Sequence, residues 1–127
     1  MTIKEVSEKY AITQDTLRYY ERIGLLPPVP RTKSGIRNYD EVSMRWIEFI
    51  KCMRQAGMSI EKLLEYMNLF HQGRKTVTLR KELLQEQKKE LEQTKEELNA
   101  TIDKLTYKIK LYEEIEQGKR KDFMEEE

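Results

Sequence analysis

Arginine and tyrosine side chains gather in the segment TLRYYERIGLLPPVP, which covers residues 16–30. Four side chains here and just before it stand at helical positions i, i+3, i+4 and i+7: Asp15, Arg18, Tyr19 and Arg22. An arginine fork donates hydrogen bonds to phosphate or guanine, and tyrosine adds a hydroxyl on a rigid ring. The spacing therefore predicts a helix face that binds nucleic acid, although an ordinary solvated face would have the same pattern.

A basic, proline-bounded loop follows this segment. All three prolines of the chain stand at positions 27, 28 and 30, where they cannot continue a helix and favour extended backbone. Residues 33–35, Lys-Ser-Gly, form the expected turn of a small two-stranded wing. Between Leu25 and Tyr39 no residue is acidic and three are basic: Arg31, Lys33 and Arg37. We expect an exposed hairpin that touches the DNA backbone or minor groove, and the alternative is a merely solvated loop.

Cys52 is the only cysteine of the chain and His71 the only histidine. A single cysteine excludes an internal disulfide and suits a reducing cytoplasm, and these two side chains cannot build a usual structural zinc site. Thiolate attack on an electrophile needs cations near the sulfur, and Lys51 and Arg54 are close in sequence. Free cysteine is also a common inert filler of apolar cores, so a thiol sensor and a core filler both stay open.

No constellation of residues suggests catalysis. Nucleophilic and acid–base chemistry needs converging side chains, and Cys52 and His71 lie on different predicted helices without a partner motif. We therefore expect no enzyme activity, no catalytic residues, no metal and no cofactor.

Helix-capping residues divide the first part of the chain into four helices. The expected N-caps are Thr2, Thr13, Asp40 and Ser59. They predict helices over residues 3–10, from 14 to about 23, from 41 to the glycine at 57, and from 60 to the glycine at 73. The first two helices are separated by about three residues, which is typical of a helix-turn-helix.

Apolar residues recur at helical spacing in the third and fourth of these helices. In the third, the expected buried stripe consists of Val42, Trp46, Phe49, Ile50 and Met53. In the fourth, the expected buried side consists of Ile60, Leu63, Leu64, Met67 and Phe70. We interpret both stripes as the core of a small helical domain and not as a cofactor site.

The rest of the chain predicts one long helix. From residue 76 to 117 there is no proline or glycine, and a seam residue recurs every seven positions: Val77, Leu84, Leu91, Leu98, Leu105 and Tyr112. Such a helix is about 60 Å long, and a domain of residues 1–75 cannot cover its seam. The second seam position holds Lys81, Lys88 and Lys95, then Ile102 and Ile109. Because these lysines would meet in an in-register parallel pair, we expect an antiparallel coiled coil between two copies of the chain.

Composition and charge limit the class of protein. Apolar residues make up 38% and charged residues 37% of the 127 residues. The apolar runs are far shorter than the roughly 20 residues that span a bilayer, and the start MTIKEVSEKY lacks the apolar block of a signal peptide. Residues 1–75 carry 13 Lys and Arg against 9 Asp and Glu, and residues 76–127 carry 11 against 14. We expect a cytoplasmic protein without membrane contact, whose basic first part meets any polyanion.

Three segments, in order TLRYYERIGLL, SGIRNYD and MRQAGMSIEKL, resemble the MerR family of bacterial transcription regulators. The resemblance covers residues 1 to about 75, and the helix that follows has the position of the family's dimerisation coil. It implies a mainly α fold with a winged helix-turn-helix domain at 1–75, a dimerisation coiled-coil helix at 76–117 and a short tail at 118–127. Cys52 is similar to the single cysteine of the subgroup linked to aldehyde and other electrophile stress.

The same resemblance implies a function. A homodimer would bind an inverted-repeat operator in double-stranded promoter DNA and distort it so that RNA polymerase engages the promoter. Carried over by position, the DNA contacts are Thr16, Arg18, Tyr19 and Arg22 from the second helix and Arg37 and Tyr39 from the wing. The alternative from another class is a coiled-coil scaffold protein without specific DNA binding.

Overall fold

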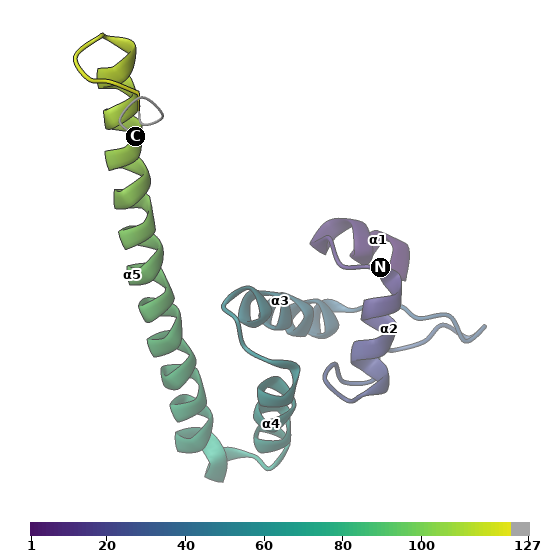
Figure 1. Ribbon diagram of the computed structural model, residues 1–127. Coiled ribbons are helices and arrows are strands. Elements are labelled where there is room, and N and C mark those ends of the chain that lie inside the picture. Colours follow the sequence, from purple (N-terminus) through teal and green to yellow (C-terminus); the bar gives the residue numbers. More distant parts are fainter. Residues whose placement is uncertain (123–127) are drawn as a thin grey trace. The chain divides into compact units, whose positions relative to one another are not determined.

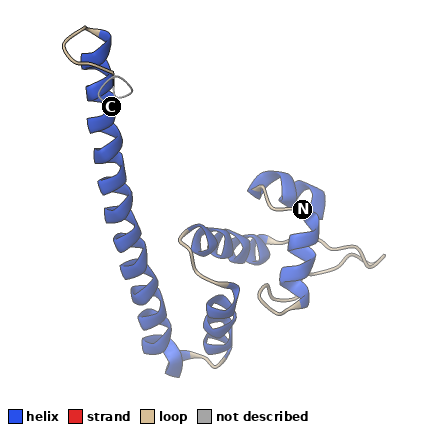
Figure 2. Ribbon diagram, in the orientation of Figure 1, coloured by secondary structure: helices blue, strands red, loops and turns tan. Residues whose placement is uncertain are grey.

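A computed structural model describes residues 1–122, and it is built from helices (Figures 1 and 2). Its elements are α1 (Ile3–Tyr10), α2 (Gln14–Arg22), α3 (Glu41–Gln55), α4 (Ile60–His71), the 3-10 turn η1 (Arg74–Thr76) and α5 (Val77–Glu116). The mainly α fold and the five α-helices confirm the prediction from the sequence. The acidic residues at 125–127, for which a disordered tail is expected, lie outside the described residues.

Side-chain caps explain where the first four helices begin. The Thr2 hydroxyl accepts from the Glu5 amide at 3.2 Å, and the Glu5 carboxylate accepts from the Thr2 amide at 3.1 Å, which completes a capping box. Thr13, Asp40 and Ser59 each accept from the amide three residues later. All four predicted caps are therefore confirmed, because each depends on a local interaction that the residue types alone dictate.

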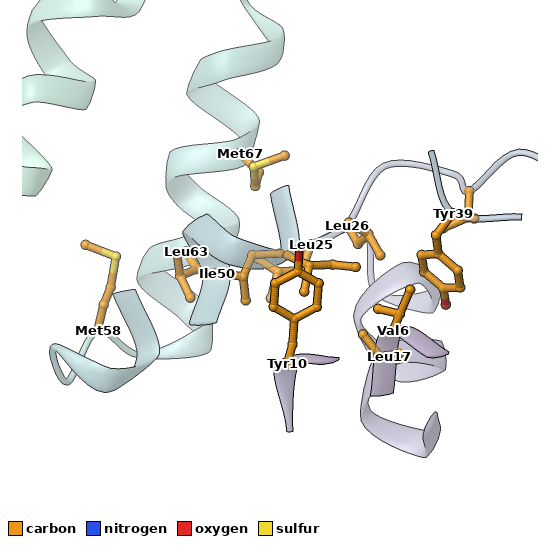
Figure 3. Packing of buried hydrophobic residues seen from close by; sticks show 12 residues of the cluster. Val6, Tyr10, Leu17, Leu25, Leu26, Tyr39, Ile50, Met58, Leu63 and Met67 are labelled. Carbon is orange, nitrogen blue, oxygen red and sulfur yellow. The ribbon is translucent and has the colours of Figure 1, made fainter. Parts of the chain in front are cut away.

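Residues 1–88 form one compact unit around an apolar core, part of which is shown in Figure 3. The fully buried members come from all four short helices and from the loops between them: Val6, Leu17, Leu25, Leu26, Ile47, Ile50, Met58 and Leu63. Burial of an aliphatic side chain stabilises the fold by about 1.5–3 kcal/mol. This core holds one side of α2 and leaves the opposite side at the surface.

The buried stripe of α3 is rotated from the predicted one. Ser43, Ile47 and Ile50 are the buried residues of this helix. Val42 is 50% exposed and Trp46 is only half-buried, so the prediction of Val42 as a core residue is wrong. A spacing of i, i+4 and i+7 fits both stripes, and only the position of the neighbouring helices decides between them.

Aromatic packing with α4 explains where the other side of α3 goes. Trp46 meets Phe70 edge-on with ring centroids 4.8 Å apart, and Phe49 lies 5.0 Å from the ring of Tyr66. Phe70 is 39% exposed, so its prediction as a buried residue is also wrong. These rings form a half-exposed aromatic layer at the edge of the core.

The wing is a hairpin loop rather than a pair of strands. Its arms share a single antiparallel bridge, between Arg31 and Arg37, and the described residues contain no strand. Gly35 donates its amide to the Thr32 carbonyl at 2.9 Å and has a φ of +85°, which glycine adopts without strain. The predicted turn is confirmed, whereas the predicted two-stranded wing is wrong because the prolines of the first arm lack the amides that a ladder needs.

α5 is one uninterrupted helix of 40 residues. Its first turns belong to the compact unit of residues 1–88, and the chain from Lys89 onward forms a second unit. Seam residues beyond Leu84 are between 43% and 58% exposed in the single chain: Leu91, Leu98, Ile102, Leu105 and Ile109. The predicted long helix is confirmed, and the domain boundaries at 75 and 117 stay predictions.

Candidate nucleic-acid interface

One face of α2 presents the polar side chains that the sequence singles out. Asp15, Thr16, Arg18, Tyr19 and Arg22 line one shallow hollow at the surface. The opposite side of the helix anchors it, because Leu17 is fully buried and Tyr20 packs half-buried against the core. The structure therefore brings together the four contact residues predicted from this helix.

Two arginines of this face are oriented by their neighbours. Arg18 Nη1 donates to Asp15 Oδ1 at 3.0 Å, and its Nη2 donates to Gln14 Oε1 at 3.4 Å. The guanidinium of Arg22 lies 5.4 Å from the ring centroid of Tyr19, a cation–π contact. Exposed pairs of this kind contribute little stability, so their effect is to hold two sets of donors ready on one surface.

Thr16 stands at the N-terminal end of the same face. The Thr13 hydroxyl donates to Thr16 Oγ1 at 2.8 Å and accepts from the Thr16 amide at 3.1 Å. Since the Thr16 oxygen acts there as an acceptor, its own proton can be donated to a ligand. The partial positive charge of the helix N-terminus favours an anion at this place.

The basic residues of the wing differ in how they are held. Lys33 is exposed, and Arg31 Nη1 donates to the carbonyl of Gly35 across the turn at 3.0 Å. Arg37 is only 24% exposed, and its Nε donates to Glu21 Oε1 at 2.7 Å. The predicted contact residue Arg37 is thus tied to α2, with its other nitrogens left as donors.

Tyr39 occupies a place that the sequence does not predict. Its side chain is 1% exposed and belongs to the apolar cluster with Leu17 and Val6 (Figure 3). Burial raises the pKa of its phenol, and its hydroxyl has no hydrogen-bond partner in the described part of the chain. Tyr39 is thus buried in this conformation, because burying the large ring is more favourable than exposing it, and its predicted contact to DNA stays a prediction.

Comparison with known families agrees with this geometry. Residues 1–69 match the family described as MerR HTH family regulatory protein, and residues 44–107 match the family described as MerR, DNA binding. The chain belongs to the MerR family. The resemblance seen in the sequence is thereby confirmed.

Relatives of this MerR-family chain are transcription regulators. It is 55% identical over 91 residues to the HTH-type transcriptional regulator AdhR of Bacillus subtilis (strain 168), a match that covers 72% of this chain and 65% of AdhR. The chain thus spans somewhat less than two thirds of that relative. These relatives are regulators rather than enzymes, in line with the expectation from the sequence.

Solved structures share the fold. A Listeria monocytogenes protein assigned to the MerR family of transcriptional regulators has a TM-score of 0.82 at 45% identity, with 89% of this chain and 86% of that chain covered. HiNmlR, a MerR family regulator lacking the sensor domain and bound to promoter DNA, also has a TM-score of 0.82, at 29% identity, with 91% and 92% covered. The winged helix-turn-helix and the long helix are therefore features of the MerR fold.

Cys52 lies at the surface of this MerR-family chain, on α3. An exposed side chain is not a core filler, so that interpretation of the sequence is wrong. The two cations closest in sequence are engaged with main-chain oxygens: Lys51 Nζ donates to Tyr10 at 2.6 Å, and Arg54 Nη1 donates to Met58 at 2.8 Å. The Cys52 thiol is therefore accessible at the surface. Lys51 and Arg54 hold α1 and the end of α3 through their hydrogen bonds.

Sequence reasoning missed Glu21, which lies between α2 and the wing. Its carboxylate accepts from the Val29 amide and from Arg37. One signal was available, since Val29 is the single residue with an amide in the proline segment 27–30 and a buried amide needs an acceptor.

Two kinds of feature are absent from the described residues. No three or more His, Cys, Asp or Glu side chains come together there in a way that could hold a metal ion. Neither does any helix of residues 1–122 have the length and apolar character required to cross a membrane.

Proposed function

We propose that this MerR-family chain is a sequence-specific transcription regulator that binds promoter DNA as a homodimer. The observation that carries the proposal is the exposed face of α2, where Thr16, Arg18, Tyr19 and Arg22 line one hollow. Forked donors, a flat ring and a hydroxyl on one helix face suit the base edges of the major groove. The presence of promoter DNA in the HiNmlR structure supports the proposal.

Contacts to the DNA backbone would come from the wing. Arg31 and Lys33 are exposed, and the wing carries no carboxylate between Leu25 and Tyr39 that would repel phosphate. Such contacts fix orientation and register without reading the sequence. A dimer presents every basic contact twice, so operator affinity should fall steeply as salt concentration rises.

The proposed homodimer forms through α5. Its seam residues are exposed in the single chain, and an antiparallel pair would place the lysines at 81, 88 and 95 against the second half of the other helix. Two recognition faces are then held at one separation. An operator for such a dimer is an inverted repeat with a fixed distance between its halves.

Regulation would act through DNA shape. If the separation of the two α2 faces does not match straight duplex DNA, the DNA must bend or twist at a cost of about 1–6 kcal/mol. The shape held by the dimer then decides how RNA polymerase, the proposed partner, meets the promoter. A protein with this activity works where the promoter is, in the bacterial cytoplasm.

DNase I footprinting on the promoter region of its own gene tests this function. We expect a protected inverted repeat in that duplex and no protection in a scrambled duplex of equal composition. The rival function, a coiled-coil scaffold, predicts equal affinity for the two duplexes and no footprint. Equal affinity for the promoter duplex and the scrambled duplex would therefore exclude the proposed function as a sequence-specific regulator.

Exposure of Cys52 favours one kind of signal for this regulator, a thiol-reactive compound such as an aldehyde. In this proposal the sulfur of Cys52 is modified, and the change reaches the DNA through α3. A Cys52→Ser variant should bind the operator with unchanged affinity and lose the response of a reporter gene to aldehyde or diamide. A full response in that variant would exclude Cys52 as the sensor.

A further inference from the structure

Glu21, on α2, uses both of its carboxylate oxygens to hold the wing. Oε2 accepts from the Val29 amide at 2.8 Å, and Oε1 accepts from Arg37 Nε at 2.7 Å. The side chains of Glu21 and Arg37 are 13% and 24% exposed. Charge-assisted hydrogen bonds this short and this sheltered are stronger than those of a surface ion pair.

The two contacts reach both arms of the wing. Val29 belongs to the first arm, and its amide is the single one in the segment 27–30 because the other three residues are prolines. Arg37 belongs to the second arm, next to Asn38, whose amide donates to the Pro30 carbonyl at 2.7 Å. One carboxylate of α2 therefore anchors each arm close to the point where the two arms meet.

We propose that Glu21 is a positioning residue that clamps the wing to α2, so that the recognition face and the wing meet DNA in one fixed orientation. The inference rests on the proposed DNA-binding function. In this arrangement the hollow lined by Arg18 and Arg22 carries the base contacts, and Lys33 at the wing tip carries a backbone contact. The clamp couples the base contacts to the backbone contact. Because the wing is already ordered before DNA binds, binding does not have to include the entropy cost of ordering it.

The direction in which Glu21→Gln changes operator affinity distinguishes this positioning role from a simple charge effect. Glu21→Gln removes a negative charge close to the proposed DNA-binding face, so Coulomb interaction alone predicts tighter binding to the polyanion. Loss of the clamp predicts weaker binding, because Gln has only one acceptor oxygen and cannot accept from both Val29 and Arg37. We expect operator affinity to fall about ten-fold at fixed salt. The matched control, Glu65→Gln at an exposed position of α4, removes the same charge and should leave affinity unchanged.

A double-mutant cycle with Lys33 tests positioning directly. In the wild-type homodimer, Lys33→Ala should weaken operator binding through the lost backbone contact. In the Glu21→Gln background the same change should cost much less, because the wing is no longer held on the DNA. Unchanged affinity of Glu21→Gln, together with a full penalty for Lys33→Ala in that background, would overturn the clamp. If Glu21→Gln does not fold by circular dichroism, Arg37→Gln, which keeps the Val29 bond, takes its place in the cycle.

Hydrogen exchange of the Val29 amide shows whether the clamp forms in the absence of DNA. Its amide should exchange slowly in the wild type and in Arg37→Gln, and fast in Glu21→Ala. Wild-type protein that does not prefer the operator over scrambled DNA would refute the proposed function, and the Val29 amide would still decide whether the clamp exists. Specific wild-type binding together with fast exchange at Val29 would refute the clamp alone.

Discussion

Gln87 on α5 donates its side-chain amide to the main-chain oxygen of Ala56, at the end of α3, over 2.8 Å. Gln87 is 5% exposed, so this bond is made away from water. Gln87→Ala should destabilise the fold by about 1–3 kcal/mol, because it leaves the Ala56 oxygen without its partner. Urea unfolding at fixed protein concentration measures the loss, and the exposed neighbour Gln85 provides the control Gln85→Ala. Equal stability of the two variants would show that the contact is weak in solution.

Arg18 should determine both affinity and base preference. Arg18→Ala removes a forked donor from the hollow on α2, so we expect operator binding to weaken by about 1–3 kcal/mol, roughly 5- to 150-fold. The preference for one base pair in each half-site should also relax. Fluorescence anisotropy with a series of operators substituted at single base pairs measures both effects. Lys104→Ala, a change of equal charge on the exposed surface of α5, is the control, and an equal loss in both variants would contradict a specific role for Arg18.

Local interactions are the part of this fold that the sequence predicts well. Thr2, Thr13, Asp40 and Ser59 cap helices through amides three residues away, so residue type and spacing suffice to find them. The heptad repeat of α5 is similarly local. The face of α2 follows from its spacing, because a helix has only one side free once the other is buried.

Long-range contacts account for the errors. Val42 and Ile47 both fit a helical apolar stripe, and only the position of the neighbouring helices decides which of them is buried. Tyr39 reads as a wing residue, yet its ring enters the core from the base of the wing. Glu21 and Arg37 are 16 residues apart, and no local rule pairs them. Each of these features depends on tertiary packing, which is not encoded in a short window of sequence.

Leu98 should be essential for the pairing of two chains. It lies near the middle of the α5 seam and is 58% exposed in the single chain. Leu98→Lys would bury two uncompensated charges at the centre of an antiparallel dimer, so we expect the dimer dissociation constant to rise at least 100-fold. Analytical ultracentrifugation measures it, with Ala100→Lys, two positions away and off the seam, as the control. A dimer of wild-type affinity in Leu98→Lys would show that the chains pair by another surface.

The buried hydroxyl of Tyr39 has no hydrogen-bond partner in the described residues, so its removal tests both the stability of the fold and a contact with DNA. A buried hydroxyl without a partner destabilises the fold, so Tyr39→Phe should raise the free energy of unfolding by roughly 1 kcal/mol. If the ring only supports the wing, operator affinity stays unchanged. A fall in affinity beyond about ten-fold would instead show that the hydroxyl reaches a phosphate when DNA binds. Urea unfolding and anisotropy on the same two proteins distinguish these outcomes.

The ion pair of Glu21 should make part of the stability depend on pH. Burial opposes ionisation of this carboxyl, but the hydrogen bonds from Arg37 and Val29, with the nearby charge of Arg31, outweigh it and lower its pKa. The stability that Glu21 contributes is therefore complete above the pKa of an unfolded glutamate, about 4.3, and is lost as pH falls through the lower folded value. The stability difference between wild type and Glu21→Gln should be largest near pH 7 and shrink below about pH 4. Urea unfolding of the two proteins at pH 7, 5, 4 and 3 measures it. A difference that stays constant across this range would mean that the two hydrogen bonds do not favour the ionised carboxylate.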